Sequence, residues 1–274
     1  SINEGKTWTV LTDALPYTSC ASVIVNHKNP KTLYLGTGDA NYYGGGNGVY
    51  KSYDEGKTWT QMNFGMGNAL VVQMYMHPKD TNIIIASTHL GIFKSVNGGG
   101  SWVKKSTVTD NYNDLAGKPN SNSGLYVTSK QSFYYSNDFG ETWTQKKVSA
   151  TDTFSSIMIG VSKADSNLLY VVTWRNKIST GKTYFGGVFK SKDGGQNWRL
   201  QSNTPQILGY SSDGTSNDGQ GGYNLTITVD PKNASNVYVG AINLWKSSDS
   251  AKTWRQQSHW AYGVHADKHH YIFS

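Results

Sequence analysis

The stretch SYDEGKTW, residues 52–59, decides the fold, because it is one of six copies of a single short pattern. The copies follow the form S-x-[DN]-x-G-x-x-W and begin at Ser1, Ser52, Ser95, Ser136, Ser191 and Ser247, with Ala251 replacing the glycine of the last copy. Their tryptophans recur about every 50 residues, a period typical of solenoids, propellers and repeat arrays. The repeat therefore predicts the architecture before any other feature is considered.

Each copy lies between two short β-forming runs, such as residues 48–51 and 58–61. This arrangement indicates a strand, a tight turn and a returning strand. In the turn, Asp or Asn accepts backbone hydrogen bonds and glycine supplies a positive φ, while the tryptophan folds back as an apolar plug. A second strand–turn–strand unit precedes most copies, as in residues 25–36, 76–85 and 229–240.

One period thus holds four strands, which predicts an all-β fold, a β-propeller of four-stranded blades. Five blades are complete, at about 19–66, 67–108, 109–149, 150–203 and 220–258. Partial blades remain at 1–18, with a turn and an outer strand, and at 259–274, with one inner strand over 264–273. Because a propeller closes to remove its edges, residues 1–274 are expected to be a single propeller domain, or a fragment of one with seven or more blades. Further domains of the same chain are also expected.

Composition agrees with a β-rich globular chain. Charged residues make up 16% of the sequence, below the roughly 25% of an average domain. The net charge is +7, but the lysines are spread along the chain and form no basic run, which argues against nucleic acid as a partner. The sequence contains no long apolar stretch, so membrane insertion is not expected. The single cysteine, Cys20, excludes an internal disulfide and is expected to be buried.

The repeated pattern resembles the Asp-box, or BNR repeat, of sialidases, xyloglucan-specific glycoside hydrolases, the sortilin ectodomain and photosystem II assembly factors. Residues 36–39, 48–52, 239–247, 258–260 and 264–269 resemble large secreted propeller proteins of Bacteroidota more narrowly. Many of those proteins end in a type IX secretion sorting domain. The resemblance implies a secreted or cell-surface bacterial protein.

The recurring positions of that box are interpreted as structural, because the turns of such boxes lie on the outer rim of a blade. The Asp-box residues are Asp54, Trp59, Asn97, Trp102, Asp138, Trp143, Asp193, Trp198, Asp249 and Trp254. Sialidase activity is not expected, because a sialidase clamps the substrate carboxylate with three arginines. The chain has only Arg175, Arg199 and Arg255, and the last two directly follow box tryptophans.

Resemblance to the xyloglucanases makes Asp39 a candidate catalytic carboxylate. Such inverting enzymes use two carboxylates roughly 6.5 to 9.5 Å apart. Asp39 precedes a loop in which Tyr42 and Tyr43 could stack on sugar rings. The partner Asp of that family lies on a second propeller, which this chain lacks. Asp39 as a polar loop cap is the alternative interpretation.

Two further groups are candidate ligand-binding residues. On the expected inner strand, His265, Asp267 and His269 point to one face and form a polar network, a ligand contact or a metal site. Steps of about 7 Å are too long for all three to meet one ion, so neither a metal nor a cofactor is predicted. The second group is the long 206–223 loop with nearby aromatic residues, a platform for a glycan or partner or else an ordinary surface loop. Its members are Trp174, Tyr184, Tyr210 and Tyr223.

The leading hypothesis is a non-enzymatic propeller module of a secreted or cell-surface bacterial protein. It would bind a carbohydrate, meaning a polysaccharide or glycan, or a surface protein through its loop face. The alternative is a glycoside hydrolase resembling the inverting xyloglucanases, with Asp39 as one catalytic carboxylate. An assembly or sorting factor for another protein is a third hypothesis.

Overall fold

The computed structural model describes residues 1, 3–17, 19–39, 45–108, 110–177, 181–262, 265–266, 268–271 and 273. They form two compact units, Ser1–Asp110 and Asn111–Ser274. All regular structure in these residues is β-strand, and no helix among them is long and apolar enough to cross a membrane. The all-β fold class is confirmed, whereas the joining of both units into one propeller domain stays a prediction.

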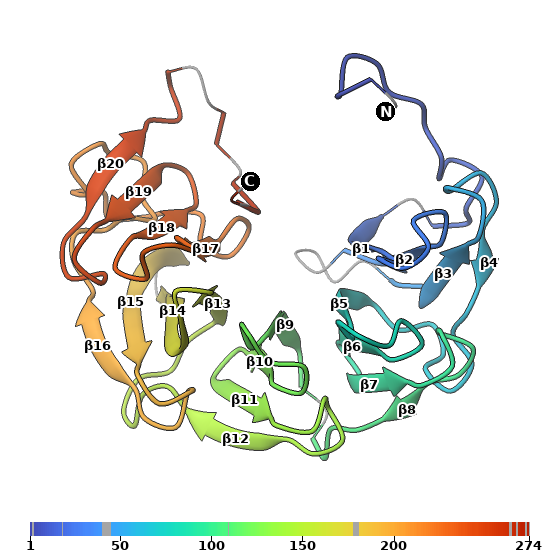
Figure 1. Ribbon diagram of the computed structural model, residues 1–274. Helices are drawn as coiled ribbons and strands as arrows, with labels where there is room; N and C mark the ends of the chain where they lie inside the picture. The colour runs from blue at the N-terminus through green and yellow to red at the C-terminus, as the bar shows by residue number, and fades with distance from the viewer. Residues whose placement is uncertain are drawn as a thin grey trace. The chain divides into compact units, whose positions relative to one another are not determined.

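The first unit contains two four-stranded antiparallel sheets whose strands pair in chain order (Figure 1). The first sheet comprises β1 (Cys20–Val25), β2 (Leu33–Thr37), β3 (Val49–Ser52) and β4 (Thr60–Gln61). The second comprises β5 (Val71–Met76), β6 (Ile84–Thr88), β7 (Gly91–Ser95) and β8 (Val103–Lys104).

The second unit contains three sheets of the same design. Its first sheet comprises β9 (Tyr112–Gly117), β10 (Leu125–Ser129), β11 (Ser132–Ser136) and β12 (Thr144–Lys147). Its second comprises β13 (Ser156–Ser162), β14 (Asp165–Lys177), β15 (Lys182–Ser191) and β16 (Arg199–Ser202). Its third comprises β17 (Thr226–Val229), β18 (Val237–Gly240), β19 (Leu244–Ser247) and β20 (Arg255–Ser258). The five sheets confirm the five predicted blades.

The core lies between successive sheets of each unit. Strands β6, β7 and β10 are buried along their whole length. The fourth strands β4 and β8 are exposed. In the second unit one apolar cluster joins Tyr170 and Val172 of β14 to Val237 and Val239 of β18. Packing between sheets therefore holds each unit together.

The five Asp-boxes that begin at Ser52, Ser95, Ser136, Ser191 and Ser247 form the turns between the third and fourth strands of their sheets, as predicted. In the box at 191–198, Ser191 Oγ donates to Asp193 Oδ1 at 2.7 Å, and the amides of Gly195 and Asn197 donate to Ser191 Oγ and Asp193 Oδ1. Burial opposes ionisation of Asp193, but the hydrogen bonds from Asn197 and Ser191 hold its pKa at about 2. The box at Ser247 closes in the same way although Ala251, with φ at 66°, replaces glycine.

Two box tryptophans form hydrogen bonds to the sheet that precedes their own. The Nε1 of Trp102 donates to the carbonyl of Met62, just after β4, at 2.8 Å. Likewise, Trp254 Nε1 donates at 2.8 Å to the hydroxyl of Ser202, the last residue of β16. The repeat is thus also the connector between neighbouring blades.

Three expectations about local structure are wrong. The described residues of 264–273 form no strand, because Lys268 turns inward: its Nζ donates to the carbonyls of Ile242 and His265, both at 2.7 Å. The segment still covers β18, since a Cβ at Gly240 would lie 2.5 Å from the Tyr271 ring. The described residues of 1–18 form a box turn but no strand. Cys20 is exposed rather than buried, because it begins β1 at the edge of its sheet.

Candidate functional site

One hairpin is longer than its counterparts in the other sheets. Strands β14 and β15 have 13 and 10 residues, whereas the second and third strands elsewhere have four or five. Their pairing continues past the sheet through Arg175 opposite Tyr184. The extension therefore carries Arg175 and Tyr184 beyond the part of the hairpin that pairs with β13.

The 206–223 loop lies along this extension and fixes it. The amide of Phe185 donates to Gln206 Oε1 at 2.9 Å, and the amide of Thr183 donates to Asp218 Oδ1 at 2.8 Å. Within the loop, Gly209 and Gly219 form an antiparallel bridge. The loop thereby replaces the missing edge partner of β15 and is ordered by side-chain hydrogen bonds.

Trp174 packs against the returning end of the same loop. A Cβ at Gly222 would lie 3.0 Å from the indole ring, and one at Gly221 would lie 2.9 Å from the Trp174 Cβ. The indole ring is also packed against the apolar cluster that contains Ile207 and Leu208. Trp174 is therefore a support for the loop rather than an open platform.

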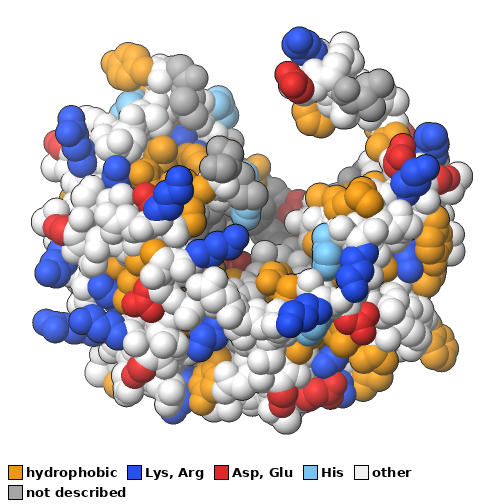
Figure 2. All heavy atoms as spheres, in the orientation of Figure 1, with side chains coloured by type: hydrophobic (Ala, Val, Ile, Leu, Met, Phe, Trp, Pro, Cys, Tyr) orange, Lys and Arg blue, Asp and Glu red, His pale blue; other side chains and the backbone are white. Residues whose placement is uncertain are grey.

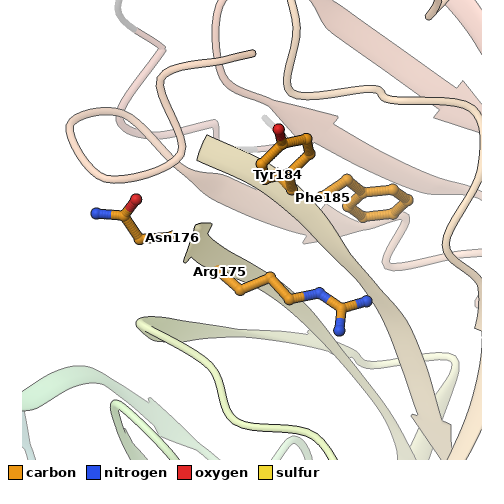
Figure 3. A pocket seen from close by; sticks show the side chains of 4 residues that line it. All are labelled: Arg175, Asn176, Tyr184 and Phe185. Carbon is orange, nitrogen blue, oxygen red and sulfur yellow. The ribbon is translucent and has the colours of Figure 1, made fainter. Parts of the chain in front are cut away.

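A cavity of about 460 Å³ opens at the extended hairpin, lined by Arg175, Asn176, Tyr184 and Phe185 (Figure 3). In Figure 3 the Arg175 guanidinium and the Phe185 ring extend to one side, whereas Asn176 points the other way. Arg175 Nη1 donates to Asp152 Oδ1 at 3.2 Å. The cavity thus combines a cation, an amide and two aromatic rings.

Asn243 joins the 206–223 loop to the segment that follows β20. Its side chain is 0% exposed. Its Nδ2 donates to the carbonyls of Gly209 and Tyr210, at 3.0 and 3.3 Å, and its Oδ1 accepts from the amide of Trp260 at 3.0 Å. One buried amide therefore holds two surface segments in register.

These two segments bring four rings together, here named the aromatic cluster: Tyr210, His259, Trp260 and Tyr262. Trp260 meets Tyr210 edge-on with ring centroids 6.4 Å apart, and His259 lies 5.8 Å from Trp260 and 5.4 Å from Tyr262. Trp260 and Tyr262 are 42% and 79% exposed. A second pair, Tyr223 and His269, meets edge-on at 5.2 Å. The cluster is a solvent-facing aromatic surface on buried supports.

The structure gathers several predicted ligand-binding residues in the second unit and leaves others apart. Tyr210, Tyr223 and His269 belong to the aromatic contacts, Tyr184 lines the cavity, and His265 is exposed beside Lys268. Asp39 is half-buried in the other unit, just after β2. Tyr42, Tyr43 and Asp267 lie outside the described residues.

The aromatic cluster also contains residues that were not singled out as ligand-binding, namely Trp260, His259 and Tyr262. The density of rings in residues 259–262 was a usable signal for them. The role of Asn243 had no such signal, because its partners lie in another loop. Among the described residues no group of three or more His, Cys, Asp or Glu side chains could hold a metal ion.

One carboxyl group away from the boxes has a raised pKa. Burial raises the pKa of Asp114, on β9, to about 6, although hydrogen bonds from the amides of Ile159 and Leu115 and the charge of His270 oppose the shift. On the face that Figure 2 shows, basic side chains are spread out and interspersed with acidic ones. The site is thus defined by rings more than by charge.

Comparison with known proteins agrees with this architecture. Residues 90–221 match the Sortilin-Vps10 family, described as sortilin, neurotensin receptor 3. None of the curated proteins compared matches the sequence. An ancestral GH74 enzyme is similar in structure, with a TM-score of 0.67 and 16% identity over 92% of this chain and 32% of that one. The GH74 xyloglucanase of Xanthomonas campestris gives a TM-score of 0.64 and 17% identity over 93% of this chain and 41% of that one.

The chain therefore spans less than half the length of these two structures. At such identities the likeness concerns the fold, and the activity of the enzymes belongs to them. The repeated Asp-box turns, the four-stranded sheets and these similarities agree with one another. The chain has a β-propeller fold, and residues 90–221 are similar to the Sortilin-Vps10 family.

Proposed function

We propose that this chain is a carbohydrate-binding propeller module that takes a polysaccharide on its aromatic cluster. The observation that carries the proposal is the set of exposed rings around Trp260. Sugar rings present apolar C–H faces and a rim of hydroxyl groups. Ligand sites commonly combine aromatic surface with a few fixed polar groups, and aromatic side chains contribute large contact areas.

Preorganisation supports the same proposal. Tyr210 and Trp260 are not on free loops, because Asn243 holds the backbone of both from a fully buried position. A ligand that stacks on these rings therefore orders little of the protein when it binds. Affinity depends strongly on such avoided ordering costs.

Binding without hydrolysis is the form we favour. Inverting hydrolysis needs two carboxyl groups on opposite sides of the scissile bond. The four residues that define the aromatic cluster are tyrosine, tryptophan and histidine, and none of them supplies a carboxyl group. The module would act on the outside of a bacterial cell, where extended polysaccharides are available. Detection of the protein in culture supernatant or on intact cells tests this location.

The test is a binding titration against neutral and acidic polysaccharides, including a mixed-linkage β-glucan, xyloglucan, polygalacturonate and alginate. Trp260→Ala is expected to weaken binding on the order of tenfold, because it removes the central ring. Tyr53→Ala is the matched control, since Tyr53 is an exposed ring of the other unit and should leave binding unchanged. A Trp260→Ala protein with wild-type affinity, or a wild type that binds no polysaccharide, sinks the proposal.

A glycoside hydrolase is the second candidate, favoured by the half-buried position of Asp39, two residues after the end of β2, and by the similarity in fold to GH74 enzymes. In that case the same polysaccharides would release reducing ends in the presence of the protein. Asp39→Asn would abolish the release and leave binding intact. Capture of a specific surface protein, with no saccharide bound, would instead favour a protein partner.

A further inference from the structure

The cavity at the extended hairpin contains one cation with donors to spare. Arg175 makes one ion pair, from Nη1 to Asp152 at 3.2 Å, and the two side chains are 41% and 35% exposed. A guanidinium group has five N–H donors in a planar fork. Among the described residues only one of these donors is engaged. The exposed pair is therefore weak and leaves part of the fork for another acceptor.

The other walls suit a sugar that carries a carboxylate. The Arg175 fork matches a carboxylate bidentately. Tyr184, which pairs with Arg175 across the hairpin, offers ring surface beside the fork. Phe185 is only 5% exposed, and Asn176 points to the other side. A cation with an aromatic neighbour is the kind of mixture expected of a site that orients a polar ring.

The cavity is built on fixed backbone. Strand β15 is clamped at its start by Gln206 and Asp218 of the 206–223 loop. The same loop contains Tyr210 of the aromatic cluster, whose carbonyl accepts a hydrogen bond from Asn243. Rigid support keeps the polar groups of a site in place and lowers the cost of binding. One loop therefore borders both the cavity and the aromatic cluster.

We infer that the Arg175 cavity is a carboxylate subsite that makes the module prefer acidic polysaccharides, those containing uronic acid residues, over neutral ones. This inference rests on the proposed function, because it names the ligand class of a carbohydrate-binding module. The net charge of +7 acts in the same direction, since it raises the local concentration of a polyanion. Asp152 orients Arg175 and at the same time competes with the ligand for it.

The experiment compares oligomers of polygalacturonate, alginate and hyaluronan with the same oligomers after reduction of their carboxyl groups to alcohols. Wild type is expected to bind at least one acidic oligomer about tenfold more tightly than its reduced form. Arg175→Ala should abolish this preference while it preserves binding of the reduced form. Asp152→Asn should increase the preference, because it removes the competing negative charge.

Controls separate the subsite from general charge and from the aromatic cluster. Arg199→Ala and Arg255→Ala, on exposed positions of β16 and β20, remove the same charge elsewhere and should leave the preference unchanged. Equal binding of acidic and reduced oligomers, with Trp260→Ala still harmful, overturns the subsite and leaves the proposed function standing. A wild-type protein that binds no oligomer, acidic or reduced, overturns both the subsite and the proposed function. Tighter binding of polyglutamate than of any uronate overturns the assignment to a saccharide and favours an acidic protein.

Discussion

Asp114 Oδ2 accepts a hydrogen bond of 2.8 Å from the backbone amide of Ile159, and this bond joins β9 to the first strand of the next sheet. The first unit repeats the arrangement with a hydroxyl, where Ser22 Oγ accepts from the amide of Met74 at 3.0 Å. In both cases the third residue of one first strand receives the amide of the fourth residue of the next. A carboxyl group thus occupies a position that a neutral hydroxyl also satisfies.

This placement predicts an unusual pH dependence. Burial raises the pKa of Asp114 to about 6 in the folded chain, above about 3.9 for an unfolded aspartate. The folded state therefore binds the extra proton between these values, and stability rises as the pH falls through this window. Relative to Asp114→Asn, wild type should gain about 2 kcal/mol between pH 7 and pH 4. Urea unfolding of both proteins at several pH values measures this gain. If the unfolding free energies of the two proteins change in parallel with pH, Asp114 does not have a raised pKa.

The box aspartates predict the opposite sign at lower pH. Asp193 has a folded pKa of about 2, held down by its hydrogen bonds against the effect of burial. Its contribution is complete above the unfolded pKa and is lost as the pH falls from about 4 towards 2. Asp193→Ala should cost about 1 kcal/mol at pH 7. The difference in unfolding free energy between wild type and Asp193→Ala should therefore vanish below pH 3. A difference that stays constant with pH would show that the ionised carboxylate does not stabilise the box.

Box tryptophans allow a matched comparison of one hydrogen bond. Trp254 Nε1 donates to Ser202, whereas Trp198 Nε1 is buried without a partner among the described residues. Phenylalanine removes the N–H from either ring. Trp254→Phe is expected to cost about 1 kcal/mol more than Trp198→Phe, because it also leaves the Ser202 hydroxyl without its donor. Thermal and urea unfolding measure the difference, and equal losses would assign the role of Trp254 to packing alone.

Backbone strain at an exposed turn position predicts a stabilising substitution. Glu55 has φ at 66° and an exposed side chain in the second box. The left-handed backbone conformation destabilises a non-glycine residue by about 1–2 kcal/mol. Glycine removes this strain, but its greater conformational entropy in the unfolded chain offsets part of the gain in stability. Glu55→Gly should therefore stabilise the first unit by about 0.5 kcal/mol. Lys57→Gly, in the same turn but without positive φ, is the control and should destabilise it.

The sequence predicted the blades because their determinants are local. A turn pattern of eight residues with flanking β-forming runs specifies the strand on each side, and it does so at each of the five sheets. The strand predicted for the terminal segment is wrong because the structure of this segment depends on a contact that is distant in sequence. Residues 264–273 alternate like a strand, but the Lys268 ammonium donates to the carbonyl of Ile242 in the 241–243 turn and to that of His265. The contact with Ile242 is one that no local pattern encodes.

The candidate site was predictable only in part, for the same physical reason. The length and glycine content of the 206–223 loop and the aromatic residues nearby pointed to Tyr210 and Tyr223. The arrangement of the rings depends on Asn243, whose partners are 17 to 34 residues away. The cavity depends on the unusual length of β14 and β15, which sequence alternation does not reveal. The arrangement of the rings and the presence of the cavity therefore depend on long-range hydrogen bonds and strand length, which the sequence motifs do not specify.

Asn243 provides the last prediction, because its two ends can be separated. Asn243→Asp keeps an acceptor for the Trp260 amide but turns a carboxylate oxygen towards the carbonyls of Gly209 and Tyr210. The 206–223 loop should then detach while the Trp260 backbone stays in place. Hydrogen exchange is expected to rise in the loop but not around Trp260, and polysaccharide affinity should fall by about tenfold because Tyr210 is displaced. Asn243→Ala, which removes both connections, should raise exchange in both segments and cost about 2–3 kcal/mol of stability. Unchanged exchange in Asn243→Asp would mean that the loop is held by Gln206 and Asp218 alone.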